Sequence, residues 1–177
     1  MVRYSSKKIK NYLSQLDHGR NMTEKGRALE DLTQYMFENI PGFNIVGKNI
    51  YDPVTGQEID LVFWIKPNGN SIPFPPGIIF VECKNYIEAV DGKESNWFID
   101  KLKKGGGEYG VLVARNGITG NEGNPKGAYS VIKGALRDRI KIIVITTKEI
   151  ENITDTDQFV ELLDRKLRNL MVPVKVR

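Results

Sequence analysis

The chain has one cysteine and one histidine among its 177 residues. A single cysteine excludes a disulfide within the chain and is typical of a reducing compartment, so we expect a cytoplasmic protein. No apolar run approaches the roughly 18 residues of a membrane-spanning helix. The N-terminus also lacks the apolar core of a signal peptide, so we expect no association with a membrane.

A phosphate-binding glycine loop is also missing. The run Gly105-Gly106-Gly107 follows a predicted helix and has neither a strand before it nor a helix N-terminus after it. A loop of this kind binds phosphate only when it joins a strand to a helix N-terminus. The three glycines therefore predict the end of a helix and not a nucleotide site.

Charge is distributed unevenly along the chain, whose net charge is +4. Residues 28–100 hold eleven Asp and Glu against four Lys and Arg, whereas residues 1–27 and 101–141 are basic. An acidic centre between basic segments suits a protein that holds a metal ion and binds a polyanion. The same runs are also consistent with ordinary solvated surfaces.

The strongest local signal is a run of apolar residues that starts at Ile78 and leads into Glu82, Cys83 and Lys84. Its β-branched and aromatic residues predict a buried strand. Because strand side chains alternate between faces, Glu82 and Lys84 share one face and Cys83 lies on the other, where we predict a core residue. Charges on a core strand require a partner or a metal ion.

A second strand is predicted at residues 57–66, where Glu58 and Asp60 share a face. Between the two strands, residues 67–77 are rich in Pro, Gly and Asn and predict a loop. The two strands are therefore expected to form an antiparallel pair around this loop.

The midpoint of the loop fixes the expected register of the pair. With the midpoint near Ser71, the residue numbers of two opposed positions sum to about 142, because opposed positions in an antiparallel pair lie equally far from the midpoint. This places Asp60 opposite Glu82 and Glu58 opposite Lys84. Three or four ionisable side chains would thus converge on one patch.

Asp60 followed by Glu82-Cys83-Lys84 resembles the motif of the PD-(D/E)xK nuclease superfamily, which includes restriction endonucleases, Mrr-like nucleases and Holliday-junction resolvases. Each part lies on a predicted strand in the order of the family's core, and Ile59 stands where the family often has proline. The resemblance implies an α/β fold with a restriction-endonuclease-like αβββαβ core, in which helices flank both faces of a mixed central sheet.

The resemblance implies that the chain is a single nuclease domain. Three parts can be distinguished within it. Residues 1–22 would be a basic helical extension, residues 23–147 the catalytic core, and residues 148–177 a closing helix and tail. The function it implies is metal-dependent hydrolysis of DNA by an endonuclease.

The site residues follow from the same resemblance. Asp60 and Glu82 would hold Mg²⁺, or Mn²⁺ as a substitute, with the backbone carbonyl of Cys83 as a further ligand. Lys84 would orient or help deprotonate the attacking water. A carboxylate on the first core helix often supports the metal site in this family, so Glu30 has either this role or that of a surface charge.

Contacts with DNA phosphates are expected from the basic segment 101–141. The candidates in it are Lys101, Lys103, Lys104, Arg115 and Lys126. Cutting both strands of a duplex needs two sites, so we expect a homodimer.

Three alternatives share these residues. A structure-specific nuclease, such as a junction resolvase, would differ only in its substrate. A non-catalytic DNA-binding or assembly subunit could use the same fold, although the complete set of Asp60, Glu82 and Lys84 argues against it. The motif could also be a structural cluster of ion pairs in an unrelated enzyme.

The helix that follows the motif strand is expected to begin with Ser95 as its N-cap and to end near Lys104. Its apolar stripe predicts that Trp97, Phe98 and Leu102 face inward, and that Lys101, Lys103 and Lys104 face outward. The other predicted helices span residues 5–16, 23–40, 124–139 and 157–171, and the other predicted strands span 43–51, 109–114 and 140–146.

Overall fold

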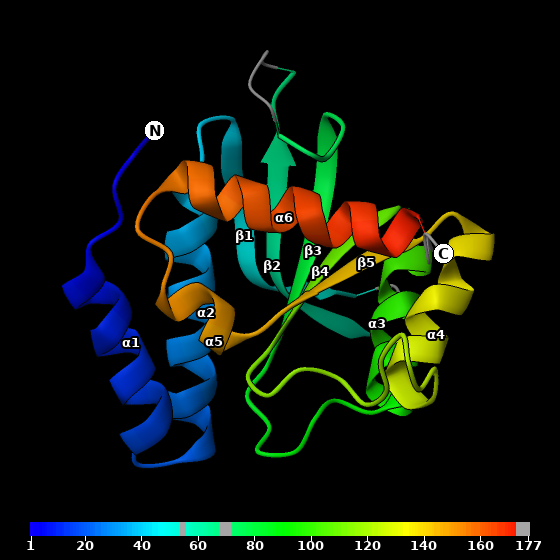
Figure 1. Ribbon diagram of the computed structural model, residues 1–177, viewed down its shortest axis with the longest axis horizontal. Helices are drawn as coiled ribbons and strands as arrows, with labels where there is room; N and C mark the ends of the chain where they lie inside the picture. The colour runs from blue at the N-terminus through cyan, green and yellow to red at the C-terminus, as the bar shows by residue number, and fades with distance from the viewer. Residues whose placement is uncertain (54–55, 68–71, 173–177) are drawn as a thin grey trace.

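The structure is a computed structural model, and it describes residues 1–53, 56–67 and 72–172. In the described residues, the chain alternates between helices and the strands of one sheet (Figure 1). The strands are Phe43–Asp52 (β1), Gln57–Ile65 (β2), Gly77–Lys84 (β3), Tyr109–Ala114 (β4) and Lys141–Ile145 (β5). The helices are Ser6–His18 (α1), Met22–Glu38 (α2), Gly92–Lys104 (α3), Gly127–Ala135 (α4), Thr147–Glu151 (α5) and Thr156–Met171 (α6), with a 3₁₀ turn at Leu136–Asp138 (η1).

The sheet is open and mixed, with the strand order β1-β2-β3-β4-β5. β1, β2 and β3 form an antiparallel meander, and β4 and β5 continue parallel to β3. Parallel neighbours need crossover connections, which α3 and α4 provide. The ends of β3 and β4 therefore point the same way, and the loops that follow them lie together at the lower edge of the molecule in Figure 1.

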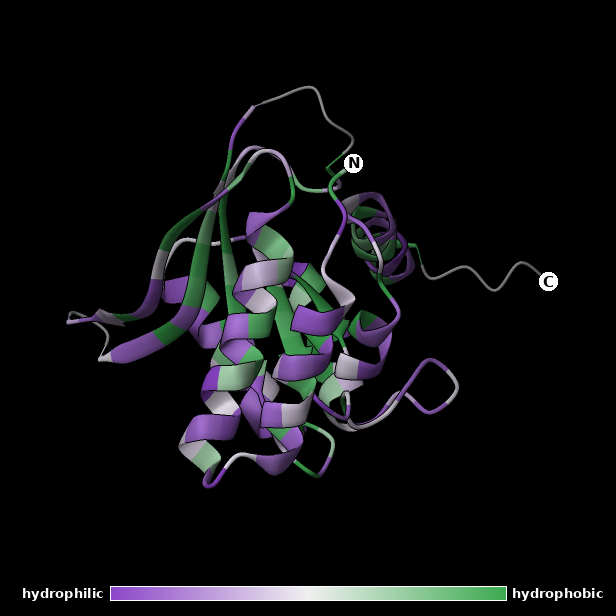
Figure 2. Cartoon of the chain, turned by 90° about the vertical axis from the view of Figure 1, so that its left-hand side faces the viewer, coloured by the Kyte–Doolittle hydropathy of each residue, from purple (hydrophilic) through white to green (hydrophobic). Residues whose placement is uncertain are grey.

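The β2–β3 register agrees with the sequence prediction. Leu61 lies opposite Val81 and Phe63 opposite Ile79, so opposed residue numbers sum to 142. The ladder stops at the Leu61–Val81 pair, although β1 stays paired with β2 as far as Gln57. The β1–β2 hairpin thus continues beyond β3, and it projects from the body of the molecule in Figure 2.

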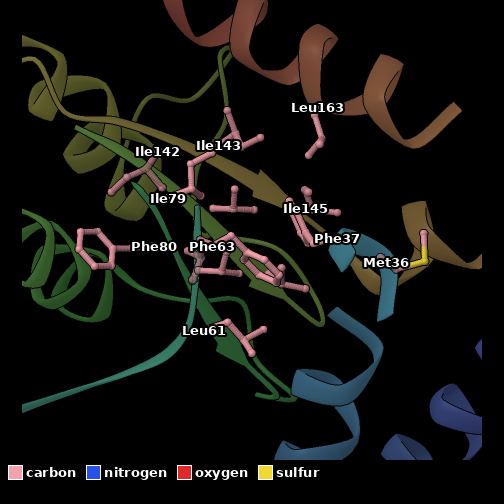
Figure 3. Close-up of a cluster of buried hydrophobic side chains, with 14 of the residues drawn as sticks. Met36, Phe37, Leu61, Phe63, Ile79, Phe80, Ile142, Ile143, Ile145 and Leu163 are labelled. Carbon is pink, nitrogen blue, oxygen red and sulfur yellow. The ribbon is translucent and has the colours of Figure 1, made fainter. Parts of the chain in front are cut away.

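Helices cover both faces of the sheet. On one face, the ring of Phe63 packs against Phe37 of α2 with 5.4 Å between the centroids, and Phe37 contacts Phe159 of α6 at 5.1 Å. On the other face, α3 lies against Phe80 and Gly110. These apolar side chains belong to one buried cluster that includes residues of every strand (Figure 3), and the burial of such area is the main force that holds the layers together.

Most predicted elements are present with boundaries within two residues, and three details were wrong. Asp91, not Ser95, caps α3, because its carboxylate accepts a hydrogen bond from the Glu94 N–H, while Ser95 is buried inside the first turn. The helix expected from Asn124 begins at Gly127, because Asn124 closes a turn with Asn121.

The third difference is α5, a single turn that the sequence analysis did not include. Its start is fixed by a reciprocal capping box between Thr146 and Glu149. The loop expected at 67–77 and the C-terminal tail each contain residues that lie outside the described part of the chain, and residues 54–55 also lie outside it. Within the described part, no helix combines the length and apolar character needed to cross a bilayer.

Gly110 allows α3 to approach the sheet closely, which generates a stability prediction. A Cβ atom at Gly110 would lie 2.8 Å from Leu102 and 2.9 Å from Phe98, both of which are buried. Gly110→Ala should therefore lower the free energy of unfolding by about 1–3 kcal/mol, the usual cost of overpacking, as measured by urea denaturation. Gly134→Ala in α4 is the control, because a Cβ there meets nothing within 4 Å. It should leave stability unchanged or raise it by roughly 0.5–1 kcal/mol, and an equal loss in both variants would contradict the packing argument.

Candidate active site

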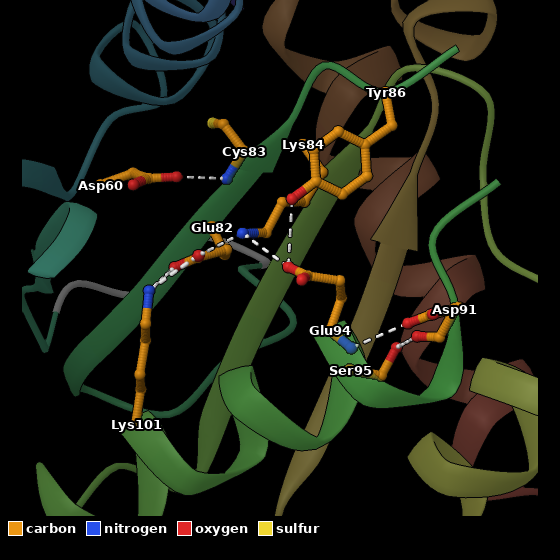
Figure 4. Close-up of polar contacts among 9 residues, drawn as sticks. All are labelled: Asp60, Glu82, Cys83, Lys84, Tyr86, Asp91, Glu94, Ser95 and Lys101. Atoms are coloured by element: carbon orange, nitrogen blue, oxygen red, sulfur yellow. Dashed lines mark hydrogen bonds and ion pairs between the residues drawn. The ribbon is translucent and has the colours of Figure 1, made fainter. Parts of the chain in front are cut away.

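The last residues of β3 carry the motif at the carboxyl end of this central strand (Figure 4). Glu82 and Lys84 lie on the face covered by α3, as strand alternation predicts. Cys83 points to the opposite face, where its sulfur lies 3.5 Å from the Thr33 hydroxyl of α2. Burial raises the pKa of the Cys83 thiol well above its usual range, which disfavours the nucleophilic thiolate, and this half-buried side chain packs against the core.

Asp60 joins the site from β2, just beyond the last rung of the β2–β3 ladder. Its carboxylate accepts a hydrogen bond of 2.7 Å from the backbone N–H of Cys83. Burial, followed by the repulsion of nearby Glu82, raises the pKa of Asp60 to about 7, against the opposing effects of the Cys83 hydrogen bond and Lys101. Asp60 is thus the acid whose ionised form is least well compensated by its surroundings.

Glu82 is the most deeply buried acid of the site, with 3 % of its side chain exposed. The Lys101 ammonium donates to both of its carboxylate oxygens at 2.8 Å, and the Lys84 ammonium lies 3.1 Å from Oε1. A buried carboxylate is tolerated only when it is paired in this way.

The orientation predicted for Lys101 was wrong, and so was that of Trp97. Lys101 reaches inward to Glu82 and keeps only 14 % of its side chain exposed, whereas Trp97 is 60 % exposed. The stripe that α3 buries consists of Ser95, Phe98, Ile99 and Leu102. At 100° per residue, Lys101 lies at the border of this stripe and Trp97 lies on the far side. A lysine at such a border can lay its alkyl chain along the core and still bring its charge to a partner.

Lys84 lies between two carboxylates. Its ammonium is 3.1 Å from Glu82 and 3.0 Å from Glu94 of α3, and the Tyr86 hydroxyl donates to Glu94 at 3.2 Å. Burial alone would lower the pKa of Lys84, but the charge of Glu82 and the hydrogen bonds to both acids outweigh it and raise the pKa well above its usual value. The second partner of Lys84 is therefore Glu94 and not Glu58, which is exposed and paired with Tyr51 across the β1–β2 ladder.

Glu30 lies beside this group on α2. One of its oxygens is 3.3 Å from the Lys48 ammonium, which also binds Asp31. The same Glu30 oxygen is buried and makes no hydrogen bond of good geometry. The charge of Glu30 contributes to the raised pKa of Asp60, so the structure brings Glu30 into the electrostatic surroundings of the motif acids.

Negative charge exceeds positive charge in this network. Five carboxylates face three ammonium groups: Glu30, Asp31, Asp60, Glu82 and Glu94 against Lys48, Lys84 and Lys101. With all five carboxylates ionised, the difference equals the charge of one divalent cation. Asp60, Glu82 and the Cys83 carbonyl are hard oxygen donors of the kind that Mg²⁺ takes, so they fit it in chemistry. Across residues 1–53, 56–67 and 72–172, however, no three His, Cys, Asp or Glu side chains are already gathered as a metal-binding group.

The other residues proposed to contact DNA lie outside this cluster. Lys103 pairs with Asp138 at 2.6 Å, Lys104 pairs with Asp100 at 2.7 Å, and Arg115 pairs with Asp17 of α1. The fifth candidate, Lys126, is exposed before α4. Exposed ion pairs are weak and can be exchanged for phosphate contacts, so DNA binding by these residues stays a prediction.

Glu94 and the inward role of Lys101 were missed by the sequence analysis. The two residues are seven apart on α3, which places them on one side of the helix two turns apart. An acid and a base at this spacing, both at the border of the apolar stripe, form the signal that could have revealed them.

The raised pKa of Asp60 predicts how the stability of the fold depends on pH. The folded protein releases this proton near pH 7 and the unfolded chain near pH 4, about the ordinary value for Asp. Ionisation of Asp60 therefore lowers the free energy of unfolding progressively as the pH rises through that window. Above the window the loss is complete. In EDTA, Asp60→Asn should melt at a higher temperature than the wild type at pH 8, with a smaller margin at pH 5.

Glu58→Gln is the matched control for this experiment, because Glu58 lies on the same strand face but is exposed. Its melting temperature should follow that of the wild type at both pH values. If the margin of Asp60→Asn did not change with pH, Asp60 would not titrate as its burial requires.

Comparison with known proteins does not identify this group of side chains. The chain matches no model of a protein family and no curated protein. Inference about function therefore rests on the chemistry of the site, where half-buried Asp60 of β2 lies next to buried Glu82 of β3 and Lys84 is held by two carboxylates.

Proposed function

We propose that this protein is an endonuclease that hydrolyses DNA phosphodiester bonds with the help of Mg²⁺ or Mn²⁺, at the site of Asp60, Glu82 and Lys84. The observation that carries the proposal is the half-buried Asp60 next to the buried Glu82. Burial, followed by repulsion from Glu82, raises the pKa of Asp60. A divalent cation between them would relieve that repulsion.

Each side chain then has a defined role. Asp60 and Glu82 would hold the cation, with the Cys83 carbonyl as a further oxygen ligand. When bound, the cation would polarise the scissile phosphate and lower the pKa of a coordinated water. Glu30 would add negative charge from α2 without being required as a direct ligand.

Lys84 would act as a fixed positive charge. Its raised pKa keeps the ammonium protonated, so it would stabilise the negative charge that develops on the phosphate and would not accept a proton from water. Glu94 and Glu82 hold the ammonium from two sides, which sets its direction before a substrate arrives. Such preorganisation is what makes an electrostatic contact useful in a transition state.

DNA is the proposed substrate because of the charge distribution and the motif. Basic segments flank the acidic site in the sequence, and phosphodiester backbones bind to basic surfaces. A second candidate role is a purely structural ion-pair cluster. The saturation of Glu82 by two lysines favours that role, because it resembles an internally neutralised pair more than an open metal site.

Cleavage assays separate these two roles. Plasmid, linear duplex, single-stranded DNA, RNA and a four-way junction should each be incubated with Mg²⁺, Mn²⁺, Ca²⁺ or EDTA. We expect cleavage of DNA with Mg²⁺ and Mn²⁺, little cleavage with Ca²⁺, whose larger and looser coordination shell positions water poorly, and none in EDTA. Preference for the junction would assign a structure-specific nuclease.

Asp60→Asn and Glu58→Gln provide the matched variants for this assay. Asp60→Asn should lower cleavage by about 100-fold or more, as expected when a major electrostatic contact is lost, while remaining folded. Glu58→Gln should keep substantial activity. Cleavage that persists in EDTA would refute the proposed mechanism, and a wild-type protein that cuts none of the substrates would leave the structural role as the better explanation.

A further inference from the structure

Lys101 and Lys84 both bind Glu82, but they are held differently. Lys84 has a second acceptor in Glu94, whose oxygen lies 3.0 Å from its ammonium. In the described part of the chain, Glu82 is the one carboxylate within ion-pair distance of the Lys101 ammonium. Lys101 also contacts both oxygens of Glu82 at 2.8 Å, whereas the Lys84 ammonium lies farther away, 3.1 Å from Oε1.

The position of the Lys101 ammonium is the one that a cation would need. The Lys101 ammonium faces both oxygens of Glu82. A cation that bound both oxygens from this side would take the same place. Figure 4 shows Lys101 reaching Glu82 from α3 on the same side as Asp60.

Release of Lys101 is sterically simple. The Lys101 ammonium is attached through a flexible four-carbon side chain near the C-terminal end of α3. The neighbouring Lys103 and Lys104 are about half exposed. Rotation of the side chain alone would take the ammonium from Glu82 to solvent. Lys84 would meanwhile stay in place, because Glu94 continues to hold it.

We infer that Lys101 is the built-in counter-ion of Glu82, and that a divalent cation binds to Asp60 and Glu82 by displacing the Lys101 ammonium. Lys101 is thus a positioning residue that sets the affinity of the site for the cation. This inference rests on the proposed metal site, and it adds that Lys101 competes with the cation for Glu82.

The first test uses the wild-type protein without DNA. Lysines are acetylated with an N-hydroxysuccinimide ester, with and without saturating Mg²⁺, and each position is quantified by mass spectrometry. Lys101 should be protected without Mg²⁺ and should become several-fold more reactive with it, whereas Lys103 should react equally in both conditions.

The second test measures binding of Mn²⁺ and Mg²⁺ by isothermal titration calorimetry. Lys101→Met should bind the cation about tenfold more tightly than the wild type, a change within the usual range of coupling between two ligands. Lys101→Arg keeps the charge and should stay as weak as the wild type. Lys103→Met controls for the loss of a surface lysine on the same helix and should not change the affinity.

The outcomes separate this inference from the proposed function. If the wild type binds Mg²⁺, while Lys101 stays protected and Lys101→Met binds no more tightly, the competition is refuted and the metal site stands. If neither the wild type nor any folded variant binds Mg²⁺ or Mn²⁺, the metal site itself is refuted and the inference falls with it. Because the acetylation test needs no substitution, a variant that fails to fold does not remove the test.

Discussion

The burial of the Glu82 carboxylate is the constraint on which the rest of the site depends. Moving an ionised group out of water costs several kcal/mol, and removing one partner of a buried pair typically costs about 3–5 kcal/mol. The Glu82 carboxylate at the end of β3 is matched by ion pairs because α3 supplies Lys101 and also Glu94, which holds Lys84. The close contact of α3 with the sheet is thus an electrostatic requirement as well as a packing arrangement.

The sheet and the meeting of Asp60 with the β3 motif could be predicted from the sequence because their signals are local. Strand alternation assigns each side chain to a face, and the Pro-rich loop between β2 and β3 limits the possible registers. The prediction that Cys83 points into the core follows from the same rule. The structure shows the expected α/β fold with a mixed sheet between helices, and the nuclease-type core and membership of the superfamily remain proposals.

The contacts made by α3 could not be predicted with the same certainty. A helix has residues at the border of its buried stripe, and a long side chain such as Lys101 can turn either way from that border. Trp97 was assigned to the apolar stripe of α3, yet the residues that pack on the sheet are Ser95, Phe98, Ile99 and Leu102, and Trp97 lies outside them. Which acid would hold Lys84 depended on where the β2–β3 ladder ends, and that end is set by the path of the hairpin in three dimensions.

The hydrogen bond from the Cys83 N–H to Asp60 has a mechanical consequence. It takes the place of the next rung after the Leu61–Val81 pair, so a side chain closes the fork at which β2 and β3 diverge. A load that bends the β1–β2 hairpin away from β3 would reach this bond before it reached the hydrophobic layers behind it. The fork therefore makes Asp60 a link between the projecting hairpin and the backbone of β3, one residue from Glu82.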